Sequence, residues 1–212
     1  MKFTIYGERC SGTNFLELAI INNFDLELTW EYNWKHFFGD FNFDQVNTDD
    51  VIFLAIARNP IEWICSFYNN PHHVPEELKT SIDDFITKPF YSLNEENEII
   101  DNMLIAPDTY YKNIFHLREV KLNFLLNVMP NKVKHYCLIK YEDLRDNYEN
   151  TLLMIQRKFK LQRNYLRFKR IVNHQKTNNV FVQKNYINDI KIETLYKITR
   201  NINIDLEKNI GY

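Results

Sequence analysis

The chain has 212 residues, of which 45% are hydrophobic and 25% charged, so it is long enough to bury one sizeable core. Its formal net charge of -2 argues against bulk binding of nucleic acid or of an anionic membrane, because such partners usually select a strongly basic surface. No linker-like stretch divides the chain, and we therefore predict a single domain over residues 1–212.

The cysteines and the apolar runs indicate the compartment. Cys10, Cys65 and Cys137 are an odd, scattered set without C-x-x-C spacing, which favours reduced thiols over disulfides or a zinc site. The first strand begins by Phe3, which leaves no room for a signal peptide, and no apolar run reaches about 18 residues. The sequence alone thus favours a soluble, cytoplasmic protein with no metal and no membrane partner.

Strand and helix signals alternate over the first third of the chain. The expected elements are a buried strand, an amphipathic helix, a strand-like stretch and a continuous apolar run typical of a central parallel strand: Lys2–Tyr6, Thr13–Asn23, Leu26–Trp34 and Val51–Ala57. Pro60 suits the first turn of a helix that follows at once. We therefore predict an α/β fold, with a central, mostly parallel sheet and helices on both faces.

The remaining two thirds begin with an irregular region. Residues 70–110 carry four prolines and many acidic side chains, with a short helix expected near Ser81–Ile86, so this region is predicted to be an insertion over the sheet. Apolar periodicity then predicts a helix, a strand and four further helices: Tyr111–Val128, Val133–Ile139, Glu149–Phe159, Tyr165–Val172, Ile192–Thr199 and Asp205–Asn209.

The turn between the first strand and the first helix has the outline of a phosphate-binding loop. Gly7 and Gly12 follow the G-x-x-x-x-G pattern, but Thr13 and Asn14 replace the Lys and Ser or Thr of a nucleoside-triphosphate loop. Backbone amides at such a turn, together with the helix dipole, favour an anion. Triphosphate chemistry is disfavoured without the lysine and the Mg²⁺-binding hydroxyl. An ordinary helix cap at Ser11 or Thr13 is the alternative.

Three motifs together resemble the P-loop-like sulfotransferase family, which uses 3′-phosphoadenosine 5′-phosphosulfate (PAPS) as the sulfuryl donor. The first is a basic residue near S-G-T, here within residues 9–13. The second is R-x-P with a serine eight positions after the arginine, here Arg58 and Ser66. The third is a histidine 22 residues before that arginine, here His36 (58 − 36 = 22). Residues 138–144 (LIKYEDL) and 206–212 (LEKNIGY) are weaker similarities.

The resemblance implies a role for each matched residue. The 5′-phosphosulfate would bind Arg9, Cys10, Ser11, Gly12, Thr13 and Asn14, and the 3′-phosphate would bind Arg58 and Ser66. His36 would be the general base for a hydroxyl or amine acceptor, and Lys35 would stabilise charge on the bridging oxygen as the product PAP departs. Lys176, Lys184 and Tyr186, in the polar segment 173–188, could close over the nucleotide, and a solvated loop is equally compatible.

Several alternatives stay open at this level. A glycan, a small hydroxylated metabolite and a peptide tyrosine are all possible acceptors, and nothing specifies an oligomeric state. A kinase-like P-loop phosphotransferase would depend on ATP and Mg²⁺, and a noncatalytic nucleotide-binding domain would bind the donor without releasing PAP. His36 by itself could also be a surface or core-edge histidine.

Overall fold

The computed structural model describes residues 1–172, 186 and 190–212. Four parallel strands form its central sheet, in the order β2-β1-β3-β6. Their bounds are Lys2–Gly7 (β1), Glu27–Leu28 (β2), Val51–Ala57 (β3) and His135–Lys140 (β6). The register pairs Gly7 with Ile56 and Ala57 with Lys140, so the carboxyl ends of the three long strands lie together.

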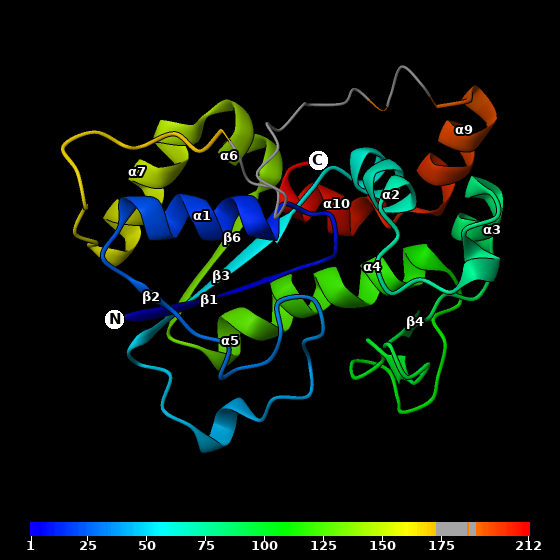
Figure 1. Cartoon of the computed structure of the whole chain (residues 1–212), viewed down its shortest axis with the longest axis horizontal. Coiled ribbons are helices and arrows are strands. Elements are labelled where there is room, and N and C mark those ends of the chain that lie inside the picture. Colours follow the sequence, from blue (N-terminus) through cyan, green and yellow to red (C-terminus); the bar gives the residue numbers. More distant parts are fainter. Residues whose placement is uncertain (173–185, 187–189) are drawn as a thin grey trace.

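Helices cover both faces of this sheet (Figure 1). On one face lie α1 (Thr13–Asn23), α6 (Tyr141–Asp146) and α7 (Tyr148–Phe159). On the other lie α4 (Ile114–Asn123), a π-helical turn (Phe124–Val128) and α5 (Met129–Lys132). The remaining helices and short turns are α2 (Pro60–Asn69), α3 (Ile82–Thr87), α9 (Ile192–Asn201), α10 (Ile204–Ile210), η1 (Phe43–Gln45) and η2 (Glu76–Leu78).

Alternate side chains of β3 divide between two cores. Ile52, Leu54 and Ile56 pack with α1, α6 and α7, and Phe53 and Ala55 pack with the π-helical turn and α5. All seven β3 side chains are buried, as expected for a central strand of a parallel sheet with both faces covered. Helix α1 and strand β3 have the bounds that the sequence predicts, which confirms both expectations.

Two sequence expectations are wrong. Only Glu27 and Leu28 of the stretch Leu26–Trp34 form a strand, and the chain turns away at Asn33, whose φ is +83°. No helix forms over Tyr165–Val172. There the Lys169 backbone bonds to Asn23 instead, since its N–H donates to Asn23 Oδ1 at 2.6 Å and its carbonyl accepts from Asn23 Nδ2 at 3.0 Å. A buried side chain thus supplies the partners that a helix would have provided.

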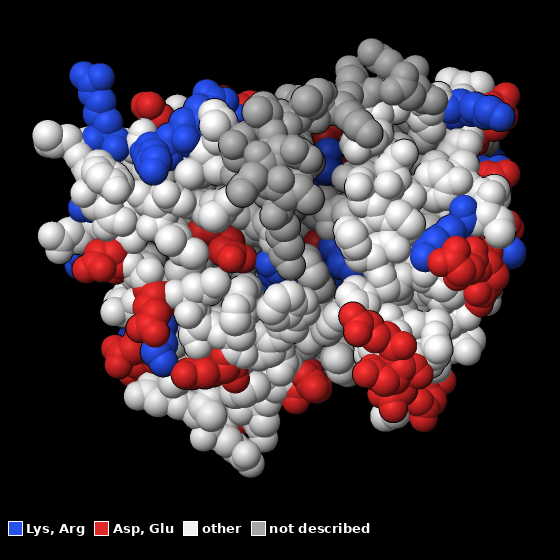
Figure 2. Space-filling view, in the orientation of Figure 1, with Lys and Arg blue, Asp and Glu red and all other residues white. Residues whose placement is uncertain are grey.

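The region 70–110 carries η2, α3 and a two-stranded antiparallel hairpin of β4 (Ser92–Leu93) and β5 (Ile99–Ile100). Its inner side joins a core with α2, α4 and α9 through Phe85, Ile86 and Phe90. Its outer side is acidic, because Glu95, Glu96 and Glu98 are exposed on the hairpin (Figure 2). These three glutamates therefore face solvent, whereas the apolar side chains of the region face the domain.

Candidate active site

The loop between β1 and α1 is shaped by two glycines. A Cβ at Gly7 would lie 2.7 Å from both the Ile56 carbonyl oxygen and Ser11 Oγ. Gly12 has a φ of +99°, and a Cβ there would meet the Tyr141 ring at 2.4 Å. Both positions exclude a side chain, and Gly12 also needs a backbone conformation that L-residues rarely adopt. Ser11 Oγ closes the loop by donating to the Glu8 carbonyl at 2.6 Å.

The start of α1 offers free hydrogen-bond donors. Gly12 is the N-cap, and no side chain in the described part of the chain caps the helix, so the ordinary cap at Ser11 or Thr13 does not form. The first turn of α1 holds no acidic residue. Among the described residues, nothing accepts a hydrogen bond from the amides of Gly12, Thr13 or Asn14. Free amides and the positive end of the helix dipole together favour an anion at this point.

Arg58 approaches the loop from the end of β3. Its Nη1 donates to the Cys10 carbonyl at 3.3 Å, and its Nη2 pairs with Glu62 at 3.1 Å. The guanidinium carbon lies 4.6 Å from the centre of the Tyr141 ring, the ring that also packs on Gly12. The Arg58 side chain is 9% exposed, and its Nε has no partner in the described part of the chain. Arg58 is thus held beside the loop with one buried donor unused.

The segment that follows fixes where Arg58 sits. Asn59 caps α2 through its side chain, which accepts from the Ile61 and Glu62 amides, and Pro60 occupies the first turn as predicted. The Asn59 amide itself donates to Glu142 at 3.0 Å. Glu142 comes from the same YEDL segment as Tyr141, so this segment holds both Arg58 and the residue after it.

Cys10 lies beside the carboxyl end of α2, the helix that carries Ser66. Ser66 is buried on α2, and the Cys10 thiol donates to the carbonyl of Asn70, the residue that caps the end of α2, at 3.7 Å. Burial raises the pKa of that thiol to about 11, although Arg9 and Arg58 act in the opposite direction. Cys10 is therefore a neutral thiol at physiological pH, and its backbone carbonyl accepts from Arg58.

Lys35 brings a cation to the loop from the connection between β2 and β3. Its ammonium donates to Asn14 Oδ1 at 2.6 Å and pairs with Glu17 at 3.0 Å, and its side chain is 5% exposed. The indoles of Trp30 and Trp34 lie 5.4 and 5.3 Å from the same nitrogen. Lys35 thus brings an ammonium group from a distant segment of the chain to the start of α1.

The neighbouring His36 has a defined tautomer. Its Nδ1 lies 2.8 Å from the Gly7 carbonyl oxygen, and since a carbonyl can only accept, Nδ1 carries the proton and Nε2 is left with a lone pair. Burial lowers the pKa of His36 well below its usual range, and the cations Lys35, Arg9 and Lys121 lower it further, against the opposing hydrogen bond to Gly7. A neutral imidazole with a free Nε2 can accept a proton at neutral pH.

Arg9 is placed differently from the sequence expectation. Its guanidinium donates to the His72 carbonyl at 2.6 Å and to Ser92 Oγ at 2.7 Å, and it pairs with Asp101 at 3.2 Å. The side chain is 3% exposed and lies over the Phe67 ring. All three partners belong to the insertion. The prediction that Arg9 grips a phosphosulfate over Ser11–Asn14 does not agree with this position, because the guanidinium is already occupied.

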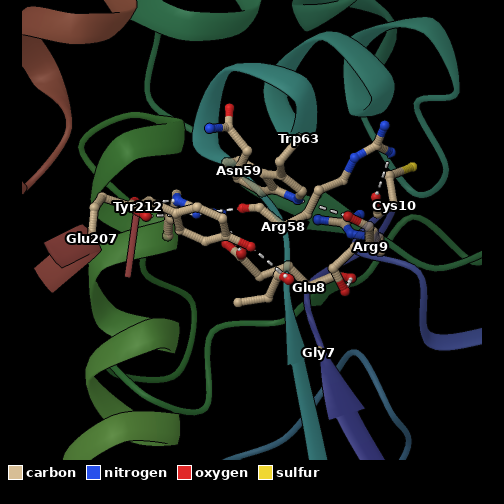
Figure 3. A network of polar contacts seen from close by, with 12 residues as sticks. Gly7, Glu8, Arg9, Cys10, Arg58, Asn59, Trp63, Glu207 and Tyr212 are labelled. Atoms are coloured by element: carbon tan, nitrogen blue, oxygen red, sulfur yellow. Dashed lines mark hydrogen bonds and ion pairs between the residues drawn. The ribbon is translucent and has the colours of Figure 1, made fainter. Parts of the chain in front are cut away.

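The adjacent Glu8 joins a buried charge network that the sequence did not indicate (Figure 3). Arg118 donates to Glu8 at 2.7 Å and to both carboxylate oxygens of Glu207 at 2.6 and 2.9 Å, and its Nη2 also donates to the Arg58 carbonyl. All three charged side chains are at most 6% exposed. Two carboxylates share one guanidinium, and Glu8 Oε1 has no hydrogen-bond partner among residues 1–172, 186 and 190–212. The network ties α10 to the ends of β1 and β3.

This network predicts a pH-dependent stability. Burial raises the pKa of Glu8 to about 7, Arg118 opposes the rise, and Glu207 adds to it. Between pH 4.5 and 7 folded Glu8 keeps a proton that the unfolded chain has lost, so stability falls as the pH rises. We expect the free energy of unfolding of the wild type, relative to Glu8→Gln, to fall by about 2 kcal/mol between pH 5 and pH 8 in urea denaturation. The exposed Glu96→Gln is the control. A difference in unfolding free energy between the wild type and Glu8→Gln that does not vary with pH would contradict a raised pKa of Glu8.

Of the segment 173–188, only Tyr186 can be placed. The centre of its ring lies 5.9 Å from the guanidinium carbon of Arg58. The ring of Tyr141 also packs against this guanidinium. Lys176 and Lys184 lie outside the described residues. Tyr186 therefore stands near the site from a part of the chain far from Arg58 in sequence.

Comparison with known proteins adds no relative. No protein-family model matches the chain, and no curated protein matches it. Within the residues that the structure describes, no helix is long and apolar enough to cross a membrane, and no group of three or more His, Cys, Asp or Glu side chains could hold a metal ion.

Sequence reasoning missed several residues that build this site. Tyr141 and Glu142 contact Arg58 and the Asn59 backbone, and the LIKYEDL motif is the signal that could have placed them there. Asp101, Arg118 and Lys121 gave no signal, because lone charges in an acidic loop and on a helix usually face solvent, whereas here they are at most 2% exposed.

Proposed function

We propose that this chain is a sulfotransferase of the P-loop-like kind, which moves a sulfuryl group from PAPS to a hydroxyl or amine. The observation that carries the proposal is the position of Arg58: a buried guanidinium stacked on Tyr141 beside the loop, where its Nε and the loop amides have no partner among the described residues. Two separate anion-binding elements at one edge of a parallel sheet suit a donor with two separate phosphate groups. The four-stranded parallel sheet and its helices are compatible with that family's architecture.

The groups that can still donate hydrogen bonds indicate which residues would bind each part of the donor. The amides of Gly12, Thr13 and Asn14, with the side chains of Ser11 and Thr13 nearby, would bind the 5′-phosphosulfate. Arg58 and Ser66 would bind the 3′-phosphate, and Arg58 already contacts the Cys10 carbonyl. Lys35, which already contacts Asn14, would take the cationic role first considered for Arg9.

The chemical step needs a proton acceptor and charge compensation. PAPS, when bound, supplies an activated sulfuryl group. His36 Nε2 would take the proton of the acceptor hydroxyl or amine as its oxygen or nitrogen bonds to sulfur. The bond from sulfur to the bridging oxygen breaks, PAP leaves with that electron pair, and the Lys35 ammonium would offset the charge that builds on the bridging oxygen. No redox step is involved.

Label transfer from two donors tests this function. We expect ³⁵S from labelled PAPS to appear in one of three acceptor pools (glycans, small hydroxylated metabolites and tyrosine peptides), with PAP released in equal amount. Transfer of ³²P from γ-labelled ATP with Mg²⁺, and none from PAPS, would overturn the proposal in favour of a phosphotransferase. PAP binding without PAP release in any pool would overturn it in favour of a noncatalytic domain.

A further inference from the structure

A buried cluster of three charged side chains lies next to the turn that carries Lys35 and His36. Asp101 pairs with Arg9 at 3.2 Å and with Lys121, and all three side chains are at most 3% exposed. Each comes from a different part of the fold: Arg9 from the β1–α1 loop, Asp101 from the insertion and Lys121 from α4. Two cations share one carboxylate, so the cluster carries one excess positive charge.

Lys121 connects this cluster to His36. Its ammonium donates to the His36 carbonyl, while the His36 ring donates from Nδ1 to the Gly7 carbonyl. The Gly7 amide also donates to the Lys35 carbonyl at 3.0 Å. The turn that carries Lys35 and His36 is therefore held by β1 on one side and by α4 on the other, and a turn bound at both sides keeps its side chains in one orientation.

The same ammonium acts on the imidazole electrostatically. Three cations face His36: Lys35 from its own turn, Arg9 from the loop and Lys121 from α4. Each disfavours an imidazolium at His36. No carboxylate is among the groups that act most strongly on the ring. Lys121 is also near Phe37 and Phe38, whose ring centres lie 5.9 and 5.0 Å from its nitrogen, so it occupies an apolar setting in which charge interactions are strengthened.

We propose that Lys121, paired with Asp101, is a positioning residue that holds the His36 turn and keeps His36 Nε2 available to accept a proton. The role of His36 as a base rests on the proposed function, whereas the placement of its turn by Lys121 rests on contacts alone. Lys121 contacts none of the groups assigned to the donor, so its removal should affect the base and spare donor binding.

Lys121→Met tests this with little risk to folding. Methionine fills much of the space of the lysine stem, and the Arg9–Asp101 pair that remains is neutral, so no unpaired charge is left buried. NMR of the His36 ring, assigned by comparison with His36→Gln, reports its titration without any acceptor. We expect the titration midpoint to rise by about half a pH unit or more in Lys121→Met, and to stay within about 0.2 units of wild type in Lys121→Arg and in the exposed control Lys132→Met.

Turnover and donor binding complete the test. With an acceptor from the label-transfer screen, Lys121→Met is expected to lower kcat about tenfold while the Kd for PAP changes less than about twofold. An unchanged His36 titration in a folded Lys121→Met, as judged by thermal unfolding, would overturn the positioning role. A shifted titration in a protein that does not bind PAP at all would support the positioning role and overturn the proposed function, so the two failures can be told apart.

Discussion

His36→Ala is expected to lower the turnover of sulfuryl transfer by roughly 10²–10⁴-fold, since that is the usual contribution of a general base. The affinity for PAP should change by less than about twofold, because the imidazole bonds to the Gly7 carbonyl and to none of the donor-binding groups. Because burial and three nearby cations hold the pKa of His36 well below its usual range, wild-type turnover should not decline as the pH falls from 7.5 to 6.5. Steady-state kinetics across this range measures both effects.

A matched control separates the base from a general loss of stability. His135 begins β6 at the amino end of the strand, whereas the candidate site lies at the carboxyl ends, so His135→Ala should retain turnover. Full turnover in His36→Ala would move the base to another residue. A parallel loss of turnover and PAP affinity would mean that His36 supports the loop instead of the chemistry.

The sequence predicted the elements whose signal is local. Val51–Ala57 is apolar at every position and Thr13–Asn23 follows a glycine turn, and both have the predicted bounds. Leu26–Trp34 looked like a strand because it is rich in Leu and Trp. However, only two of its residues pair with β1, and the rest bends at Asn33 to bring Lys35 and His36 to the loop. Such a bend depends on contacts with distant segments, which a local pattern cannot reveal.

In the candidate site, too, local spacing predicted some positions and not others. Gly12, Arg58, Ser66 and His36 were found by spacing, and the structure brings them around one loop. Arg9 was expected at the anion because it precedes S-G-T closely. Two of its actual partners, Ser92 and Asp101, lie more than 80 residues away in sequence, and nothing in the motif indicates them. Tertiary contacts decide where a long side chain points, and spacing does not.

Arg58→Met should weaken PAP binding about 100-fold, because charge-assisted hydrogen bonds to a phosphate would be lost from a buried position. Binding of 5′-AMP, which lacks the 3′-phosphate, should change less than about threefold. The stem of methionine can still pack on Tyr141, so the loop should keep its shape. Arg145→Met is a suitable control: this arginine also pairs with Glu62 and lies 5.6 Å from the Tyr141 ring centre, but no donor contact is assigned to it. Equal losses for PAP and 5′-AMP in Arg58→Met would indicate a structural role.

Calorimetric titration of the wild-type chain with PAP and with 5′-AMP tests the central claim most directly, because it needs no acceptor. Arg58, Ser66 and the free amides of the loop predict a preference of at least about 30-fold for PAP, which corresponds to roughly 2 kcal/mol. The preference should disappear in Arg58→Met and persist in Arg145→Met. Equal binding of the two nucleotides by the wild-type chain would contradict the assignment of Arg58 and Ser66 to a 3′-phosphate, and with it the proposal that the donor is PAPS.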